Sequence, residues 1–461
     1  MLYIINRNEK PSAKLNWVIM ILILPICGIS LYLLFGEGRP TRRMNRRISA
    51  AKRENAGVLV QDAEVKAFVD RGGRNTETCR YLMNYANYPA YGEGDVTYYP
   101  SGKEMFKDML DALEGAKKFI LAEYFIISGG KMWDTFRELL LKKANEGVEI
   151  KLIFDDVGSL LLLPPKYDKY LESLHPNIKC FRFNPAVPVF TMRMNNRDHR
   201  KIFVVDGAVG FTGGINLADE YINEVKRFGY WKDTGVRIEG EAVWSLTSMF
   251  LSMWNYIVHS TEDYSRFMPA QHQKAPFEND GFVQPYGDSP LDHENVGENI
   301  YLNIINRAKN YVYIFTPYLI IDHEMLTALC NAAKDGVDVR IVTPGIPDKK
   351  MIFLLTQSYY APLIQSGVKI YQYTPGFIHA KCFVCDDEIA TVGSVNLDFR
   401  SLYLHFECGV FFYRSAVVAQ VKEDCLNTFA CSEQMTAEFC RNRPVPVRLL
   451  QSVLRLLAPL L

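Results

Sequence analysis

The stretch HRKIFVVDGAVGFTGGIN, residues 199–216, recurs later in the chain as HAKCFVCDDEIATVGSVN, residues 379–396. Each copy begins with His-x-Lys on a run of apolar residues, and the two-residue period of a strand places the His and Lys side chains on one face. An Asp follows five residues after each Lys, where Gly or Asp favours a turn into a second strand. Because the pattern occurs twice, it indicates an internal duplication that decides the fold.

The flanking sequence repeats in the same order. Each copy is preceded by an apolar strand after an Ala-Lys pair, and then by a helix end, a glycine and an alternating strand. These matching blocks are residues 116–127 with 308–321, and residues 142–156 with 331–345. Strands that alternate with helices are typical of α/β units, so the sequence predicts two α/β sandwich halves related by a pseudo-twofold axis.

We divide the chain into six parts on these grounds. A polar stretch with Pro and Gly lies between the two repeats and suits a linker. The expected parts are an N-terminal segment (1–14), a transmembrane helix (15–36), a basic juxtamembrane linker (37–94), a first half (95–270), a second half (280–440) and a C-terminal amphipathic helix (441–461).

Composition excludes several classes of protein. With 461 residues, 48% apolar and 23% charged, the chain has the composition of an ordinary globular protein of more than one domain. The formal net charge is zero, which argues against nucleic acid as a partner. The ten cysteines do not have the spacing of a structural zinc site, and a reducing compartment is the simpler assumption.

The N-terminal region carries an uncharged apolar run over residues 15–36, long enough to cross a bilayer, with Trp17 and Tyr32 near its two ends. A cleaved signal peptide would have a shorter apolar region that ends in small residues. Seven basic residues and no acid follow within 39–53, against three basic residues before the run. By the positive-inside rule, the catalytic halves would face the cytoplasm from the cell membrane.

The last segment, residues 444–461, sets Arg448 and Arg455 two helical turns apart in an otherwise apolar helix. Such a helix suits a membrane interface. A helix docked on the protein is an equally good interpretation, and the sequence leaves both open.

The repeated stretch carries groups that suit a phosphate. Its second strand ends in GGIN (213–216) in one copy and GSVN (393–396) in the other. Glycine lets backbone N–H groups approach an anion, and the Asn side chain adds a donor. Together with the His and the Lys, one copy therefore offers an imidazole, an ammonium, an amide and backbone N–H groups to a tetrahedral oxyanion.

Two copies supply what covalent displacement at phosphorus requires, namely a nucleophile on one side and an acid at the leaving oxygen on the other. His199 and His379 would lie on opposite sides of one phosphodiester. The groups that would hold its non-bridging oxygens are Lys201, Lys381, Asn216 and Asn396. Because no carboxylate cluster with metal-ligand spacing accompanies them, we predict neither a metal nor another cofactor.

The two stretches are similar to the paired HxKxxxxD motifs of the phospholipase D superfamily, and their surroundings resemble the bacterial cardiolipin synthases. The resemblance covers nearly the whole chain from about residue 15. It includes DDVGS at 155, GFTGGINLADEY at 210, YWKDTGVRIEG at 230, TPYLI at 316, GVKIYQYTPGFIHAK at 367 and NLDFRSLYLHFE at 396.

This resemblance implies an activity. The synthases transfer a phosphatidyl group from one phosphatidylglycerol to a glycerol hydroxyl of another, and release glycerol as cardiolipin forms. It therefore implies a membrane-embedded phosphatidyltransferase that acts on phosphatidylglycerol and other membrane phospholipids through a covalent phosphohistidine. The sequence leaves the oligomeric state open.

Residue roles follow by position. The resemblance implies that His199 and His379 are nucleophile and general acid, with His199 as the nucleophile by analogy, and that Lys201 and Lys381 act beside them. The implied phosphate-binding residues are Asn216, Asn396, Gly213, Gly214, Gly393 and Ser394.

Two further acids match the family pattern about 30 residues downstream of each HxK, namely Asp233 in YWKDT and Glu407 in LHFE. The resemblance implies that they orient the histidines, since a carboxylate on the far ring nitrogen fixes the tautomer. We expect Glu407, rather than the motif Asp206, to steady His199. Asp206 and its counterpart Asp386 would then mainly tie down their turns.

The chain departs from the family in three respects. The synthases usually have two N-terminal membrane spans, whereas this sequence predicts one. They commonly have Gln where this chain has Phe315, and Asn where it has His405. Both substitutions change the polarity expected around the pocket.

Several other functions share these motifs. A phospholipase D hydrolase would use the same intermediate and resolve it with water, and another phosphatidyltransferase would use a different acceptor. A nuclease is disfavoured by the apolar N-terminus and the zero net charge. A membrane scaffold with an inactive fold is disfavoured because His, Lys and Asn are intact in both copies.

Overall fold

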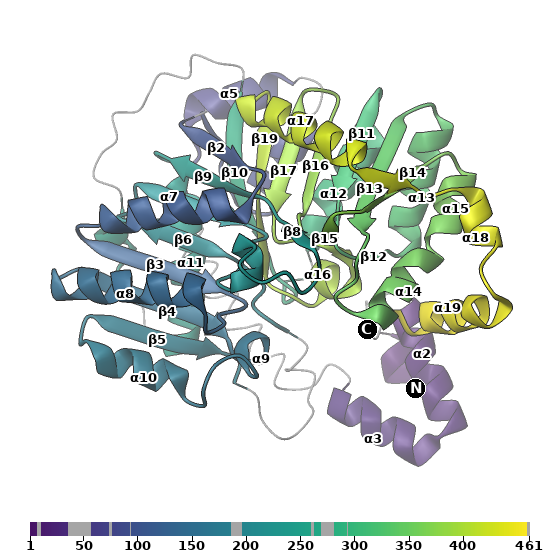
Figure 1. The fold of residues 1–461 in the computed structure, drawn as a ribbon, viewed down its shortest axis with the longest axis horizontal. Coiled ribbons are helices and arrows are strands. Elements are labelled where there is room, and N and C mark those ends of the chain that lie inside the picture. The colour runs from purple at the N-terminus through teal and green to yellow at the C-terminus, as the bar shows by residue number, and fades with distance from the viewer. Residues whose placement is uncertain are drawn as a thin grey trace.

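The computed structural model describes residues 1–6, 11–35, 57–72, 76–92, 94–185, 196–259, 262–268, 281–292 and 294–458. Within these residues the chain forms two large β-sheets with helices packed on them (Figure 1).

The first sheet contains seven strands in the order β2-β9-β7-β6-β3-β4-β5. Its central strands are almost entirely buried, and β6 is apolar throughout, as expected of strands covered on both faces. In chain order the strands are β2 (Val96–Tyr99), β3 (Phe119–Tyr124), β4 (Glu149–Asp155), β5 (Ile178–Phe183), β6 (Ile202–Val205), β7 (Val209–Gly213) and β9 (Gly235–Glu239).

The second sheet contains nine strands in the order β1-β10-β19-β17-β16-β11-β13-β14-β20. They are β1 (Tyr91–Gly92), β10 (Phe282–Asp288), β11 (Tyr311–Phe315), β13 (Asp338–Pro344), β14 (Lys369–Tyr373), β16 (Cys382–Cys385), β17 (Ile389–Gly393), β19 (Glu407–Tyr413) and β20 (Ser432–Gln434). Two short pairs complete the strands: β8 (Tyr230–Lys232) with β15 (Gly376–Ile378), and β12 (Leu319–Ile320) with β18 (Leu397–Asp398).

The two sheets repeat one topology. In the first, β3, β4 and β5 are parallel, and β6, β7, β9 and β2 extend the sheet antiparallel from β3. In the second, β11, β13 and β14 are parallel, and β16, β17, β19 and β10 follow antiparallel from β11. Strands β1 and β20 are additional edges. The order and direction of the strands confirm the duplication predicted from the sequence.

Helices cover both sheets and divide the core. Helices α7, α8 and α10 lie along one face of the first sheet, and α17 lies over the second (Figure 1). Helix α11 packs on β3, β6 and β7 and also on β10, so it joins the two halves. The apolar cluster around Trp133 and Phe136 lies in the first half except for Phe377, whereas the larger cluster is continuous across both halves.

The helices have these bounds: α1 (Leu2–Ile5), α5 (Ala63–Arg71), α6 (Thr76–Asn84), α7 (Gly102–Glu114), α8 (Lys131–Asn145), α9 (Asp156–Ser159), α10 (Tyr167–Leu174), α11 (Val243–Val258), α12 (Val296–Arg307), α13 (His323–Lys334), α14 (Lys350–Ser358), α15 (Tyr360–Gln365), α16 (Phe399–Tyr403), α17 (Ala416–Ala430), α18 (Ala437–Arg441) and α19 (Val445–Leu457), with short 3-10 turns at Asp219–Ile222 and Tyr264–Phe267.

The apolar N-terminal run forms two helices, and the expectation of one continuous helix over 15–36 is wrong. Helix α2 (Pro11–Ile23) ends just before Pro25, where α3 (Pro25–Phe35) begins, because proline disrupts the interior of a helix. The chain folds back there, so Trp17 and Tyr32 meet with ring centroids 5.3 Å apart instead of marking opposite ends of a span. Gly28 permits this close approach, since a Cβ there would lie 2.7 Å from the carbonyl oxygen of Met20.

None of the described helices combines the length and the apolar character needed to cross a membrane.

The segment expected to be a juxtamembrane linker is largely folded where the structure describes it. Residues 37–56, which hold most of its basic residues, lie outside the described part. Beyond them, α5 and α6 bury Val65, Val69 and Leu82, and β1 pairs with β10 as an edge of the second sheet. The apolar spacing in this segment was the signal for structure, although its net polarity suggested a linker.

The motif aspartates anchor the two halves in the same way. The Asp206 carboxylate accepts hydrogen bonds from the backbone N–H groups of residues 117–119, at 2.7 to 2.9 Å. Asp386 accepts from those of residues 309–311, at 2.8 to 2.9 Å. Each aspartate therefore ties the turn after its motif strand to the start of the neighbouring antiparallel strand, β3 or β11.

We predict that Asp386→Ala lowers the unfolding free energy by about 2 kcal/mol or more, because three backbone donors lose their charged acceptor. Asp387→Ala is a matched control: its exposed carboxylate pairs with Lys422 and accepts from the Tyr311 hydroxyl, and its loss should cost less than about 1 kcal/mol. Chemical denaturation followed by circular dichroism measures both. Equal losses in the two variants would contradict the anchoring role.

Candidate active site

The HxK residues lie just before β6 and β16, and their side chains alternate between two sides of the chain. His199 and Lys201 are both buried, as are His379 and Lys381. The residue between the first pair, Arg200, points the opposite way, toward α11 and β10. Because side chains alternate along an extended chain, His199 and Lys201 lie on one side and Arg200 on the other, as the sequence predicted.

His199 contacts a carboxylate from the other half of the protein. Its Nδ1 lies 2.9 Å from Oε2 of Glu407, at the start of β19. The Ser394 hydroxyl donates to the same carboxylate oxygen, and the Ser401 hydroxyl donates to Oε1 at 2.7 Å. Because a carboxylate is only an acceptor, this contact places the imidazole proton on Nδ1 and leaves the Nε2 lone pair available.

His379 has the mirror arrangement. Its Nδ1 lies 2.6 Å from Oδ2 of Asp233, which follows β8 in the first half. The backbone N–H of Thr234 donates to Oδ1 of Asp233 at 2.8 Å. The structure therefore pairs each histidine with a carboxylate from the opposite half, and the pair His199–Glu407 is the one expected from the sequence.

Backbone hydrogen bonds between the halves create these pairings. The N–H of His199 donates to the carbonyl of Phe406 at 2.9 Å, and that residue's N–H donates back to Arg197 at 2.9 Å. The parallel pair β8–β15 continues into a 2.7 Å bond from the His379 N–H to the carbonyl of Lys232. Each histidine thus sits next to the residue that precedes its partner carboxylate.

The two lysines lie against the histidines of their own motifs. Lys201 and Lys381 donate from Nζ to the carbonyl oxygens of His199 and His379. Lys381 Nζ also lies 2.8 Å from Nδ1 of His379, the nitrogen that contacts Asp233. Nδ1 carries at most one proton, which it donates in the hydrogen bond to the Asp233 carboxylate. The nearby ammonium of Lys381 therefore repels a second proton on the ring and lowers the pKa of His379.

Burial and the lysine charges disfavour protonation of both imidazoles in the free protein. Burial, followed by the charges of Lys201 and Lys381, keeps the pKa of His199 well below its usual value. Burial and Lys381 lower the pKa of His379 to about 4, against an opposing effect of Asp233. The pKa of Asp233 is itself lowered: burial would raise it, but His379 and Lys381 outweigh that effect.

The lysines are perturbed in the same direction. Burial lowers the pKa of Lys201 to about 8 and that of Lys381 to about 7, although neighbouring carboxylates including Glu407 and Asp233 partly oppose the shift. Positive charge in this site is therefore costly without an anion, and a bound phosphodiester would relieve that cost.

The glycine-rich ends of β7 and β17 serve a different purpose from the expected one. The N–H groups of Gly214, Gly393 and Ser394 donate to backbone carbonyls, at 2.8 to 3.2 Å, so they are engaged within the protein. A Cβ on Gly214 would overlap Oδ1 of Asp233, and a Cβ on Gly393 would lie 2.5 Å from the carbonyl oxygen of Cys408.

These glycines therefore make room for Asp233 and for the neighbouring strand β19. Gly213, with φ near +151°, packs its Cα closely on Gly235. Ser394 occupies the position that Gly214 has in the other copy, and its hydroxyl contacts Glu407 instead of facing outward as a free donor. We expected backbone N–H groups here to face a phosphate, but those of Gly214, Gly393 and Ser394 bond to the protein instead.

The two asparagines differ. Asn216 accepts from the backbone N–H of Ile126 at 3.0 Å and donates to the Tyr221 hydroxyl at 2.6 Å, so both ends of its amide are engaged. Asn396 is also buried, and its Oδ1 has no hydrogen-bond partner among the described residues. Of the two, Asn396 is the one whose side chain retains capacity for another ligand.

Aromatic side chains surround both histidines, and sequence reasoning did not single them out. Phe125 lies edge-on to His199 with ring centroids 4.9 Å apart. Tyr221, Trp231 and Phe377 lie 5.3 to 6.0 Å from His379. Trp231 lies in the block YWKDT and Phe377 in the block PGFIH, each two residues from Asp233 or His379, and this closeness in sequence could have indicated them.

His405 forms a third histidine in the site. Its ring centroid lies 5.6 Å from that of His199, and its Nδ1 lies 3.7 Å from Oε1 of Glu407. The ligand atoms of His199, His405 and Glu407 all lie within 4.8 Å of one another. The sequence did not indicate this cluster, and the hydrogen bonds from His199, Ser394 and Ser401 already engage both oxygens of the Glu407 carboxylate.

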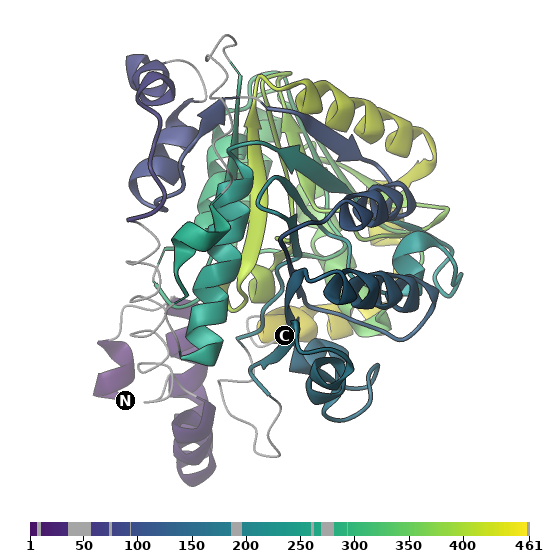
Figure 2. The same cartoon turned by 90° about the vertical axis from the view of Figure 1, so that its left-hand side faces the viewer.

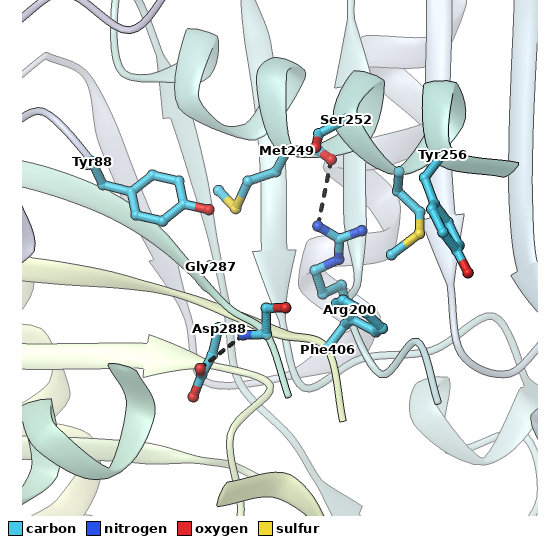
Figure 3. Close-up of a pocket in the computed structure, with 10 residues that line it drawn as sticks. Tyr88, Arg200, Met249, Ser252, Tyr256, Gly287, Asp288 and Phe406 are labelled. Atoms are coloured by element: carbon cyan, nitrogen blue, oxygen red, sulfur yellow. Dashed lines mark hydrogen bonds between the residues drawn. The ribbon is translucent and has the colours of Figure 1, made fainter. Parts of the chain in front are cut away.

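Two buried ion pairs support the first motif from behind. Arg197 pairs with Asp155, its Nε donating to both carboxylate oxygens at 2.9 and 3.0 Å. Arg200 pairs with Glu123 at 2.5 Å and donates to the carbonyl of Met249 at 3.4 Å. Figure 3 shows Arg200 among α11 and β10 residues, beside a cavity of about 30 Å³, which is large enough for a single water.

The arrangement can perform nucleophilic displacement at phosphorus. It offers two imidazoles whose Nδ1 atoms contact carboxylates, and two buried lysines whose charge the neighbouring carboxylates compensate only in part. An imidazole held in this way is a nucleophile when neutral and an acid when protonated. Both imidazoles, and therefore both possible roles, are present in this buried site.

Comparisons with known proteins agree with this chemistry. Residues 301–427 match the family model described as "Cardiolipin synthase, PLD-like domain". A cardiolipin synthase of Alkalihalophilus pseudofirmus is 33% identical over 99% of this chain and 90% of its own length. Cardiolipin synthase 1 of Bacillus anthracis is 32% identical with the same coverage, and an uncharacterized protein of Streptococcus mutans serotype c is 42% identical over 100% of this chain and 99% of its own.

A solved structure shares the fold. The crystal structure of phosphatidylserine synthase from Haemophilus influenzae Rd KW20 superposes with a TM-score of 0.62, over 84% of this chain and 100% of that one, at 17% identity. Fold and family together define a phosphatidyltransferase of the phospholipase D superfamily. Within that superfamily, the chain belongs to the cardiolipin synthase family.

We predict that Gly214→Ala impairs activity on the order of 100-fold, since its Cβ would displace the Asp233 carboxylate from His379 and misplacement by about 1 Å can cost that much. Gly115→Ala, at φ −76° with its Cβ 3.4 Å from the nearest oxygen, is the matched control and should keep full activity. The kcat of each variant, at unchanged thermal midpoint, is the measurement. A fully active Gly214→Ala enzyme would exclude this role.

Proposed function

We propose that this protein synthesises cardiolipin by transferring a phosphatidyl group between two phosphatidylglycerol molecules without a metal, through a phosphohistidine. The observation that carries the proposal is the crossed pairing of His199 with Glu407 and of His379 with Asp233, at 2.9 and 2.6 Å, beside Lys201 and Lys381. Curated relatives named cardiolipin synthase, 32 to 33% identical over nearly the whole chain, support the choice of product.

In the first step, Nε2 of His199 attacks the phosphorus of phosphatidylglycerol, and the bond to the glycerol headgroup breaks. His379 gives its proton to the departing glycerol oxygen, so glycerol leaves as a neutral alcohol. Lys201 and Lys381 stabilise the charge on the non-bridging oxygens. The unpartnered Oδ1 of Asn396 can accept a hydrogen bond from a glycerol hydroxyl of the substrate.

In the second step, a glycerol hydroxyl of another phosphatidylglycerol attacks the phosphohistidine. Neutral His379 takes the hydroxyl proton as the new phosphorus–oxygen bond forms and the bond to His199 breaks. Cardiolipin is released, both imidazoles return to their starting states, and the proton that His379 gave in the first step is regained.

The assignment of His199 as nucleophile rests on the difference between the two histidines. Burial, both lysines and His379 all lower the pKa of His199, which favours the neutral form that attacks. Asp233 opposes the lowering at His379 by its charge and its hydrogen bond, which favours the protonated form that donates. The negative charge of a bound phosphodiester would offset the lysine charges and raise the lowered pKa of His379, so that this imidazole is protonated when the substrate is in place.

Transfer rather than hydrolysis is supported by the enclosure of the site. The two histidines are only 6 and 7% exposed, and Phe125, Trp231 and Phe377 surround them. Apolar walls exclude water and leave a lipid hydroxyl as the acceptor. A phospholipase D hydrolase and a transferase with another acceptor use the same intermediate and are distinguished by their products.

A membrane location is part of the proposal. The α2–α3 hairpin exposes Leu22, Ile23, Ile26 and Leu33 to more than half of their area, which is unfavourable in water. We place this hairpin in the cell membrane. The basic stretch 39–53 orients the catalytic halves toward the cytoplasm, where anionic lipids are exposed.

Incubation of the purified full chain with labelled phosphatidylglycerol and EDTA should yield cardiolipin and glycerol. His199→Ala should abolish both products, whereas His323→Ala, an exposed position at the start of α13, should not. Phosphatidic acid as the main product would instead establish a hydrolase. Loss of activity in EDTA that zinc or magnesium restores would contradict the metal-free mechanism.

Acid quenching during turnover, followed by peptide mapping, should locate a phosphate on His199. Modification of His379 alone would reverse the roles of the two histidines. His379→Ala should still form the intermediate with a substrate whose leaving group needs no protonation, since only the acid is lost.

We further predict that kcat/KM for phosphatidylglycerol falls as pH rises through about 7 to 8, the lowered pKa values of Lys381 and Lys201. The charged lysine exists below its pKa, so the loss lies on the alkaline side, and kcat/KM reports the free enzyme. Lys381→Arg, which keeps its charge, should move the fall to higher pH. A flat profile up to the ordinary lysine pKa would contradict this.

A further inference from the structure

The C-terminal helix α19 has its apolar face turned outward. Val445, Leu449, Val453 and Leu456 recur at intervals of three and four residues, and each is 53 to 73% exposed. The buried side of the helix contains Gln451, Leu454 and Ala458. A helix docked on a protein in water is expected to do the reverse and bury its leucines.

A third side of α19 borders a cavity of about 210 Å³ between this helix, α18 and the end of α14. Arg448, Ser452 and Arg455 line it from α19, and Arg443 lines it from the turn before. The remaining lining includes Gln357, Ser358 and Gln451 and contains no acid. The cavity thus collects three positive charges and hydroxyl and amide groups.

The three arginines lack carboxylate partners. Arg443 donates to Oε1 of Gln357 at 2.5 Å, and its guanidinium lies 4.5 Å from the Phe439 ring centre. Arg455 lies 4.5 Å from the ring centre of Tyr359. Within the described part of the chain, no ion pair involves any of the three, and the side chain of Arg448 has no hydrogen-bond partner at all. Their charge is therefore available to an anion.

We infer that this cavity binds the phosphate of an anionic phospholipid in the bilayer, at a site separate from the two histidines. Guanidinium groups suit phosphate because they offer several donors in a plane. The exposed leucines on the adjoining side of α19 would enter the acyl region beneath the same headgroup. Free phosphate would use the arginines but would leave those leucines in water, so a lipid fits both observations.

The position of the cavity agrees with a membrane face. Both views place α19 toward the same end of the molecule as the α2–α3 hairpin (Figures 1 and 2). Helix α14 runs from Lys350 to Ser358, which lines the cavity, and its nine residues span about 13 Å. A lipid held there would fix this end of the protein at the surface from which the substrate comes.

The inference is independent of the chemistry at His199, because binding to vesicles requires no turnover. We would measure the affinity of the full chain for vesicles of phosphatidylglycerol and of phosphatidylcholine by flotation. Arg448→Gln should weaken binding to phosphatidylglycerol by about fivefold, the effect of one well-placed basic residue, and should leave binding to phosphatidylcholine unchanged. Arg441→Gln, an exposed arginine next to the cavity but not lining it, should change binding by less than twofold.

A second measurement isolates α19 from the hairpin. Leu456→Trp should show fluorescence quenching by brominated phosphatidylglycerol beyond that of the parent chain, and adding Arg448→Gln should reduce the extra quenching. An equal loss of affinity in Arg441→Gln would show that the effect comes from the net charge of the protein and would overturn the assignment to this cavity. Displacement by inorganic phosphate would indicate a free-phosphate site, and no extra quenching at Leu456→Trp would overturn the membrane contact.

Discussion

Backbone hydrogen bonds between the two halves hold each histidine against a carboxylate of the other half. The bridge from His199 to Phe406 brings Glu407 into contact, and the β8–β15 pair brings His379 to Asp233. Neither half contains a complete histidine–carboxylate pair by itself. Much of the remaining structure, including the crossing strands and the shared core around α11, keeps these two bridges in register.

The pairing of each histidine with a carboxylate of the other half explains the packing near the site. Gly214 has no side chain because the Asp233 carboxylate occupies that space, whereas Ser394 at the equivalent position reaches the longer Glu407. The duplicated halves have thus diverged where they meet while their strand order stayed the same. The difference gives the two imidazoles unequal surroundings, as the proposed roles of nucleophile and acid require.

Burial sets the electrostatics of the site. The lowered pKa values of both histidines and both lysines have desolvation as their largest cause. Positive charge is therefore held in low-dielectric surroundings that an anionic phosphodiester would complete. The exposed apolar hairpin and the outward leucines of α19 lie toward one end of the molecule.

The sequence by itself determined the duplication, the α/β class and the identity of the histidines and lysines, because these are local patterns that occur twice. It also indicated Glu407 for His199 through a family resemblance. Tertiary structure decided the fold-back at Pro25 and the folding of the segment with α5 and α6. It also decided the hydrogen-bond partners of the Gly214 and Gly393 N–H groups and the outward apolar face of α19. Periodicity shows that a helix has two faces, but only packing determines which face meets the protein and which N–H groups the neighbouring strands use.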